Sequence, residues 1–255
     1  PCRIRLKWIT QVSLQIMKKY WSGLMNNYCL VCTARSGSYY VMNHIAKEKN
    51  LDCGKEWYGR MKKVHYNNTL QTSKVDIDYT VNDNLLTNHE IEKRRMWLEN
   101  RDNFIIKCMP GQLSSTVENR DMAIDERAEI AVDILSDYKI IWLTNRNKLS
   151  QFCFRFIAQE TSRAGYKGTN REYSDYDPNN RKIPLPNSFT ATKEEFDRFI
   201  RIEKFTNNLR KYFPDCEEII YEDFIRDKDI IPNPDYTNIF TNYDEICEWF
   251  TTYSK

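Results

Sequence analysis

Residues 28–50, which read YCLVCTARSGSYYVMNHIAKEKN, constrain the fold more than any other segment of the chain. The segment begins with a short, nearly continuous apolar run, which is typical of a strand buried on both faces of a sheet. A small polar turn containing Gly37 follows. Residues 39–50 then have the apolar spacing and the charged end of a helix. The segment therefore predicts a β-turn-α unit.

Further strand-like and helix-like segments extend this pattern along the chain. The predicted strands are 103–109, 138–144 and 217–223, and the predicted helices are 125–137 and 192–213. Strands that alternate with helices predict an α/β fold with a central parallel sheet of four to five strands and helices on both faces. With 255 residues and 41% hydrophobic residues, the chain has the size of one domain, 1–255.

Two segments lack clear periodicity, and a third precedes the first strand. Residues 57–83 and 165–188 are expected to be long loops over the acceptor site, because long loops in compact domains are often functional. Residues 1–27 are expected to form a helical extension, because residues 1–25 are basic and amphipathic. Polar residues interrupt their apolar stretch, which argues against a membrane-spanning helix or a signal peptide. We expect a cytoplasmic protein unless an upstream anchor precedes Pro1.

Charge and cysteine content exclude several classes of function. The 38 Lys and Arg residues nearly balance the 36 Asp and Glu residues, so nothing indicates a nucleic-acid or membrane-surface partner. Cys29, Cys32, Cys108 and Cys153 fall in apolar runs and are expected to be reduced core thiols. In a strand, Cys29 and Cys32 point to opposite faces, and no second CxxC pair completes a metal site, so we expect no metal.

The turn at residues 35–38 predicts a local anion site. The start of a helix presents unpaired N–H groups at the positive end of the helix dipole. Ser36 and Ser38 add hydroxyl donors, Gly37 permits close approach of the backbone, and Arg35 adds a positive charge. The lysine-containing phosphate loop G-x-x-x-x-G-K-[ST] is absent from this turn, which disfavours a kinase.

Five segments in order resemble the sulfotransferase family, in particular its trehalose 2-sulfotransferase-like carbohydrate enzymes. They are TARSGSYYVMNHI (33–45), CGKEWY (53–58), FIIKCMPGQ (104–112), IIWLTNRNKLSQFCFRFIAQET (140–161) and EEIIYEDFIRD (217–227). The first resembles the phosphosulfate-binding loop of the family, and the last resembles its Y-E-D-L ending. The resemblance covers residues 28–227 and implies a P-loop-like, three-layer fold.

The resemblance implies a donor, 3′-phosphoadenosine 5′-phosphosulfate (PAPS), with 3′-phosphoadenosine 5′-phosphate (PAP) as product. Residues 35–38 would hold the 5′-phosphosulfate, and Arg146 or Asn145 would face the 3′-phosphate. Tyr39 stands where the family has a threonine in the binding loop. Phe154 stands where the family has a serine, and Ser150, one helical turn earlier, could replace it.

For catalysis, the resemblance implies that Glu56 is the base that accepts a proton from the acceptor hydroxyl. Partial burial would raise its pKa towards a useful value. Lys107 would approach the active site, with a strand-end salt bridge as the alternative, and Arg35 would contribute its charge. The rival bases are His44, His65 and His89.

Two further groups of residues have simpler interpretations. Residues 221–223 are expected to serve the fold, with Glu222 or Asp223 tying down a nearby loop. An aromatic set could stack against sugar rings, although the chain has 16 tyrosines and such clusters arise easily. Its members are Trp57, Tyr58, Tyr66, Tyr166 and Tyr173.

The sequence thus predicts a PAPS-dependent sulfotransferase, independent of metal, that acts on a hydroxyl of a carbohydrate or glycolipid-like acceptor. A degenerate relative that binds a nucleotide or a partner without catalysis is the first alternative, because of Tyr39 and Phe154. A nucleotide kinase with an unusual phosphate loop is the second. The acceptor's identity and a homodimeric state are left open.

Overall fold

The structure is a computed structural model in which part of the chain is described. The described residues are 26–34, 36–59, 63–67, 74–78, 86–114, 116, 118–119, 121–163, 188–226 and 235–253. For residues 63–67, 74–78, 114 and 161–163, only the backbone is described.

The described strands form one sheet in the order β4-β3-β2-β5-β1-β6-β7. Its central five strands, β2, β5, β1, β6 and β7, are all parallel, as the sequence predicts. Two strands, β3 and β4, add an antiparallel hairpin at one edge. The bounds are β1 (Tyr28–Val31), β2 (Asp52–Glu56), β3 (Lys63–Asn67), β4 (Lys74–Asp78), β5 (Phe104–Cys108), β6 (Lys139–Thr144) and β7 (Glu217–Ile220).

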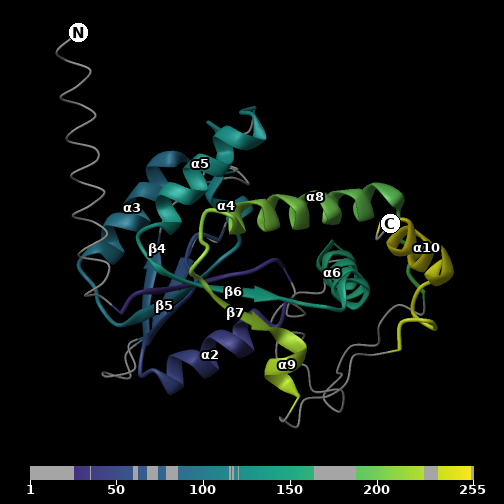
Figure 1. Cartoon of the computed structure of the whole chain (residues 1–255), viewed down its shortest axis with the longest axis horizontal. Helices are drawn as coiled ribbons and strands as arrows, with labels where there is room; N and C mark the ends of the chain where they lie inside the picture. The colour runs from purple at the N-terminus through teal and green to yellow at the C-terminus, as the bar shows by residue number, and fades with distance from the viewer. Residues whose placement is uncertain are drawn as a thin grey trace.

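Helices cover both faces of the parallel sheet (Figure 1). One face packs against α3 (Asn88–Glu99), α5 (Ile124–Leu135) and the end of α8 (Lys193–Arg210). The other face packs against α2 (Ser38–Glu48) and α9 (Tyr221–Ile225). Cys29 belongs to the first core and Cys32 to the second, so the prediction that they lie on opposite faces is confirmed.

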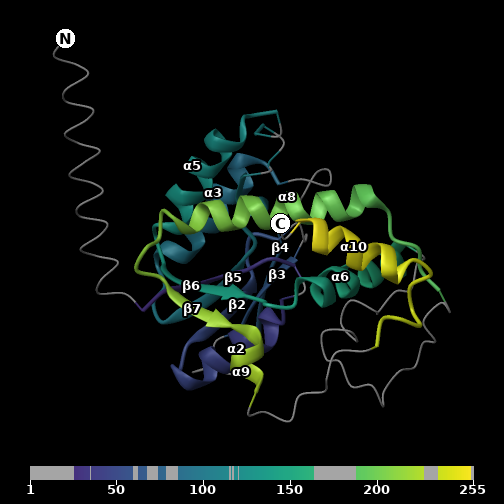
Figure 2. The same cartoon turned by 45° about the vertical axis from the view of Figure 1, so that its right-hand side comes forward.

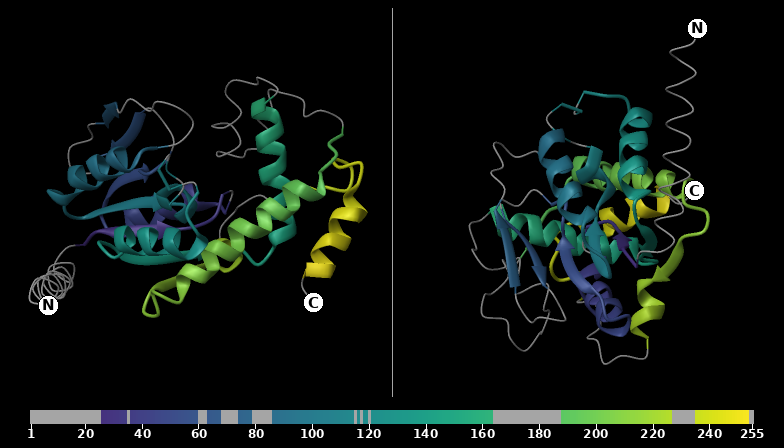
Figure 3. Two further views of the ribbon diagram at one scale, coloured as in Figure 1. Left: turned by 90° about the horizontal axis from the view of Figure 1, so that it is seen from above. Right: turned by 90° about the vertical axis from the view of Figure 1, so that its left-hand side faces the viewer.

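A third apolar cluster lies beyond the end of the sheet. It joins α6 (Lys148–Arg163), the first half of α8 and α10 (Tyr243–Tyr253), which lie together in Figure 2. Figure 3 shows α8 running from the sheet to this group. Leu209 of α8 packs in the sheet core, whereas Phe196 and Phe199 pack in the third cluster. Among the described helices, none combines the length and the apolar composition that crossing a bilayer requires.

Most of the predicted elements are confirmed, with shorter bounds. The predicted strand 217–223 is the main correction, because β7 ends at Ile220 and Tyr221 starts α9. Residues 57–83, predicted to be a loop, include β3 and β4. Among the elements that contribute to the cores, β2, α3 and α10 were not predicted. The loop prediction for 165–188 lies outside the described residues up to residue 187, and the helix prediction for 1–27 does so up to residue 25.

Gly37 has the left-handed conformation that joins β1 to α2, with φ of 72°. A Cβ atom at this position would lie 2.0 Å from Cε2 of Tyr221, so the ring of Tyr221 fills the space that any other side chain would need. The glycine therefore serves both the backbone turn and the packing of α9.

We predict that Gly37→Ala lowers the free energy of unfolding by about 2–4 kcal/mol, through left-handed strain and the clash with Tyr221. Urea unfolding measures the change. Gly111 of α4 (Pro110–Ser114) is the matched control, because a Cβ there meets nothing within 4 Å. Gly111→Ala should change stability by less than about 1 kcal/mol. Equal effects of the two substitutions would contradict this interpretation.

Candidate functional site

The topology of the sheet indicates a candidate binding region at the carboxyl ends of β1 and β5. From β1 the chain passes through α2 to β2, and from β5 it passes through α5 to β6 on the opposite face and in the opposite direction. In open α/β sheets, ligands bind outside the carboxyl ends of the strands at such a switch point. Residues that follow β1, β5 and the adjacent β2 and β6 are therefore the candidates for function.

A bulge in β2 brings Glu56 opposite Lys107. Cys53 pairs with Ile105 and Glu56 pairs with Lys107, so β2 has one residue more than β5 over this interval. Within the bulge, Lys55 has a positive φ of 47°, which costs a non-glycine residue about 1–2 kcal/mol. Bulges re-aim side chains and are common beside active sites. Here the bulge brings a carboxylate and an ammonium group together.

Glu56 and Lys107 form a buried ion pair at the carboxyl end of the sheet. Lys107 Nζ lies 2.8 Å from Glu56 Oε2, and the two side chains are 6% and 19% exposed. Gln112 of α4 donates from Nε2 to Glu56 Oε1 at 2.7 Å. The hydroxyl of Tyr39 donates to Glu56 Oε2 at 3.4 Å, and the ring of Tyr39 lies 3.8 Å from Lys107 Nζ. We call Glu56, Lys107, Gln112 and Tyr39 the carboxylate cluster.

The electrostatics of the carboxylate cluster correct one prediction. Burial alone would raise the pKa of Glu56, but the charge of Lys107 and hydrogen bonds from Lys107, Gln112 and Tyr39 hold this pKa below its ordinary value of 4.5. Burial likewise opposes the charge on Lys107, but Glu56 raises the pKa of Lys107 above 10.5. In the free protein, Glu56 is therefore a weak base, and the expectation that burial raises its pKa is wrong.

The pH dependence of stability follows from these directions. The folded state lowers the pKa of Glu56. The contribution of Glu56 to the free energy of unfolding is therefore present above pH 4.5 and is lost as the pH falls through the folded-state pKa. The folded state raises the pKa of Lys107. The contribution of Lys107 to the free energy of unfolding is therefore present below pH 10.5 and is lost as the pH rises through the folded-state pKa. The pair is thus fully ionised at neutral pH.

The turn that starts α2 lies against the carboxylate cluster. Ser36 and Ser38 are 0% and 5% exposed, and Tyr39 is the residue that links the turn to Glu56. Within the described residues, no hydrogen bond uses the backbone N–H groups of residues 36–39 as donors. Gln151 of α6 fixes the preceding residues by donating to Thr33 Oγ1 at 2.7 Å and to the carbonyl oxygen of Ala34 at 2.9 Å.

Three buried polar atoms near the ends of neighbouring strands make no hydrogen bond within the described part of the chain. They are Ser36 Oγ after β1, Gln112 Oε1 after β5 and Asn145 Oδ1 after β6. Ser36 Oγ lacks ordinary hydrogen-bond geometry, yet it lies close enough to the Cys32 thiol to oppose the burial that raises the pKa of this thiol. Native proteins rarely bury polar atoms without a partner, so these atoms mark the region as a candidate binding site.

The predicted tie between the Tyr-Glu-Asp segment and a loop is confirmed. Glu222 accepts hydrogen bonds from the backbone N–H groups of Arg146 and Asn147, each at 3.0 Å. Asp223 forms an ion pair with the Arg146 guanidinium, whose Nη1 donates to Asp223 Oδ1 at 2.8 Å. Arg146, predicted to face a 3′-phosphate, is thus engaged by a carboxylate in the free protein.

The remaining predicted residues lie apart from the carboxylate cluster or outside the described residues. Ser150 is 7% exposed, and its hydroxyl donates to the Tyr236 hydroxyl at 3.4 Å. Phe154 packs at the edge of the third apolar cluster. His44 lies 3.9 Å from Glu48. Arg35 and the side chain of His65 lie outside the described residues.

The other aromatic and histidine candidates lie in the core, at the surface or outside the described residues. Trp57 and Tyr58 are 0% exposed, and both pack in the core between the sheet and α3, α5 and α8. These two residues are therefore not surfaces for stacking sugar rings. His89 is exposed in the first turn of α3. The side chain of Tyr66, and both Tyr166 and Tyr173, lie outside the described residues.

Sequence reasoning missed Gln112, Gln151 and Cys32 as parts of the site. Gln112 ends the segment FIIKCMPGQ, so the resemblance contains a signal for it. Gln151 stands in the segment 140–161, so the resemblance contains a signal for it as well. The position of Cys32 beside Ser36 depends on how the turn after β1 packs, and nothing in its local sequence indicates this.

A groove on α3 and α5 shares no residue with the carboxylate cluster. We assign the candidate site to the carboxylate cluster, because the ion pair lies at the switch point, beside backbone N–H groups of residues 36–39 that donate no hydrogen bond within the described residues. No protein-family model matches the chain, and no curated protein matches it.

We predict that Glu56→Gln and Lys107→Met each lower the free energy of unfolding by about 3–5 kcal/mol, because each substitution leaves the other member of a buried pair unpaired. The double substitution should cost at least about 1 kcal/mol less than the sum of the single ones. Urea unfolding of all four proteins at neutral pH measures this coupling energy. Additive effects would contradict the ion pair.

Proposed function

We propose that the chain is a sulfotransferase that moves a sulfuryl group from PAPS to a hydroxyl of a carbohydrate or glycolipid-like acceptor. One observation carries the proposal: a buried carboxylate–ammonium pair lies beside a glycine turn at the start of a helix, at the switch point of a parallel sheet. The five segments that resemble sulfotransferases include this turn, Glu56 and Lys107. We likewise propose that the sheet and this turn together make a P-loop-like fold.

The turn and its surroundings partly fit the donor. Ser36 Oγ is a buried hydroxyl that makes no hydrogen bond within the described residues, and the N–H groups of residues 36–39 are available as donors. Such groups at the start of a helix bind phosphate or sulfate oxygens. Asn145 Oδ1, which makes no hydrogen bond within the described residues, is an acceptor, so it would suit a hydroxyl or amino group of the donor nucleotide and not its 3′-phosphate. Arg146 would have to exchange Asp223 for the 3′-phosphate.

PAPS would supply the sulfuryl group, and the residues of the chain would orient it and remove a proton. Lys107 would stabilise negative charge on the transferring group and on the departing phosphate. Glu56 Oε2 would accept the proton of the acceptor hydroxyl as the oxygen–sulfur bond forms. Gln112 would keep the Glu56 carboxylate oriented through its hydrogen bond to Oε1.

The low pKa of Glu56 in the free protein fits this role if the donor changes it. Lys107 holds the pKa of Glu56 down. Negative charge beside Lys107 would compete for the ammonium group and would raise the pKa of Glu56. Glu56 would then be a stronger base in the complex than in the free protein.

A second candidate function is nucleotide binding without transfer. The observation that favours it is that the Glu56 carboxylate is already engaged. Lys107, Gln112 and Tyr39 all contact it. A carboxylate held in this way serves the structure whether or not it ever accepts a proton. The two functions differ in one measurable respect, which is transfer after binding.

We predict that the chain binds PAP in calorimetry and transfers labelled sulfate from PAPS to at least one acceptor in a panel of sugars, glycolipids and phenols. Glu56→Gln should lower the transfer rate by about 10²–10⁴-fold, which is the usual contribution of a general base. Binding of PAP should persist in Glu56→Gln.

Glu248→Gln is the matched control, because Glu248 is exposed on α10 and far from this chemistry. It should transfer sulfate at the parental rate. PAP binding without transfer to any acceptor would favour the second candidate. Preference for ATP with magnesium over PAP would contradict the sulfotransferase and favour a kinase.

A further inference from the structure

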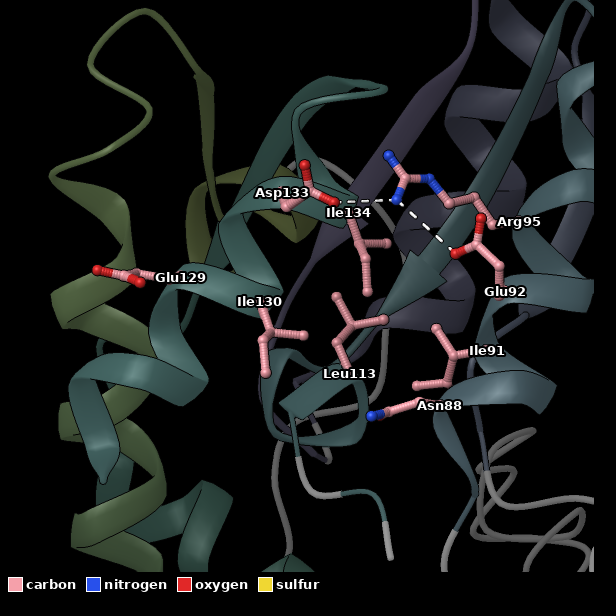
Figure 4. Close-up of a pocket in the computed structure, with 9 residues that line it drawn as sticks. All are labelled: Asn88, Ile91, Glu92, Arg95, Leu113, Glu129, Ile130, Asp133 and Ile134. Atoms are coloured by element: carbon pink, nitrogen blue, oxygen red, sulfur yellow. Dashed lines mark hydrogen bonds and ion pairs between the residues drawn. The ribbon is translucent and has the colours of Figure 1, made fainter. Parts of the chain in front are cut away.

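A groove of about 320 Å³ lies between α3 and α5 (Figure 4). Its aliphatic lining comes from α3, α4 and α5, and the residues are Ile91, Leu113, Ile130 and Ile134. Its polar lining consists of Asn88, Glu92, Arg95, Glu129 and Asp133. The groove is open to one side, so it suits an extended or helical segment better than an enclosed small molecule.

The charge of the groove is negative. Arg95 Nε lies 2.6 Å from Asp137 Oδ2, and its Nη1 lies 3.0 Å from Asp133 Oδ2, so two carboxylates already share one guanidinium. Glu92 lies 3.9 Å from the same Nη1 atom. Glu129 forms no ion pair within the described residues. An occupant with positive charge would therefore complement the groove.

Arg95 does not offset this charge at the surface of the groove. Its side chain is 10% exposed, and Asp133 and Asp137 already pair with its guanidinium. The groove thus suits basic and aliphatic side chains, which together describe a basic peptide segment.

Residues 1–25 of the same chain have this chemistry. They contain no acidic residue, and their five basic residues are Arg3, Arg5, Lys7, Lys18 and Lys19. Aliphatic residues stand between these charges, for example Ile4, Leu6 and Ile16. Charge and apolar content therefore match the groove.

The position at which this segment joins the fold also suits docking into the groove. Asn27 donates from Nδ2 to the carbonyl oxygen of Arg101 at 3.1 Å, just after α3, and its own carbonyl oxygen accepts from the N–H of Lys139 at 2.8 Å, just after α5. The chain thus enters the sheet beside the ends of the two helices that form the groove. From the end of α3 back to Ile91 is about 12 Å along the helix, which a segment of this length can reach.

We propose that residues 1–25 dock into the groove between α3 and α5, with lysine and arginine side chains beside Glu92 and Glu129. This inference concerns a surface that shares no residue with the carboxylate cluster and does not depend on the proposed sulfotransferase activity.

Zero-length carbodiimide cross-linking of the full chain, mapped by mass spectrometry, tests the docking. We predict amide cross-links from Lys7, Lys18 or Lys19 to Glu129 within a single chain. They should fall several-fold at high salt, which screens the attraction. Glu92→Lys should also lower them several-fold, because it reverses a charge at the rim and leaves Glu129 free to react.

Glu248→Lys is the matched control, since it makes the same charge change on α10, and it should leave the Glu129 cross-links unchanged. Mixed ¹⁵N-labelled and unlabelled chains separate contacts within one chain from contacts between copies. Cross-links found only between copies would overturn the proposal. Cross-links spread equally over exposed carboxylates, including Glu248, would overturn it as well.

Discussion

The buried ion pair between Glu56 and Lys107 is the interaction on which the rest of the candidate site depends. It joins the last residue of β2 to β5, and it reaches α4 through Gln112 and α2 through Tyr39. A lysine that is 6% exposed can remain charged only if a carboxylate is held against it. The left-handed Lys55 in the bulge of β2 is part of the cost of holding this carboxylate in place.

The parts of the fold that were predictable are those in which local sequence and final environment agree. β1, β5 and β6 are buried on both faces and read as apolar runs, so their burial is visible in the sequence. β2 reads DCGKE and becomes a strand because β5 offers it a partner, which is a tertiary effect. The short hairpin β3–β4 depends on its own pairing in the same way. α3 is rich in charge, and its buried face includes Arg94 and Arg95, which an apolar pattern does not reveal.

In the candidate site, too, some features could be predicted from local sequence and others depend on tertiary structure. Glu56, Lys107 and the turn at residues 36–38 could be named from the sequence through the resemblance, because each stands in a short segment. The contact between Glu56 and Lys107 could not, because it depends on one extra residue in β2. The predicted direction of the Glu56 pKa was wrong for this reason: burial was foreseen, but the cation beside the carboxylate outweighs burial. Tyr39, read as a departure from the sulfotransferase loop, instead links the turn to the carboxylate cluster.

The ionisation of Glu56 tests this account most directly. An NMR titration that follows the side-chain carboxyl carbon of Glu56 would measure its pKa in the folded protein. The account predicts a midpoint below 4.5 in the free protein and a higher midpoint in Lys107→Met, in which the cation is gone and burial remains. A midpoint at or above 4.5 in the unaltered chain, unchanged by Lys107→Met, would contradict it.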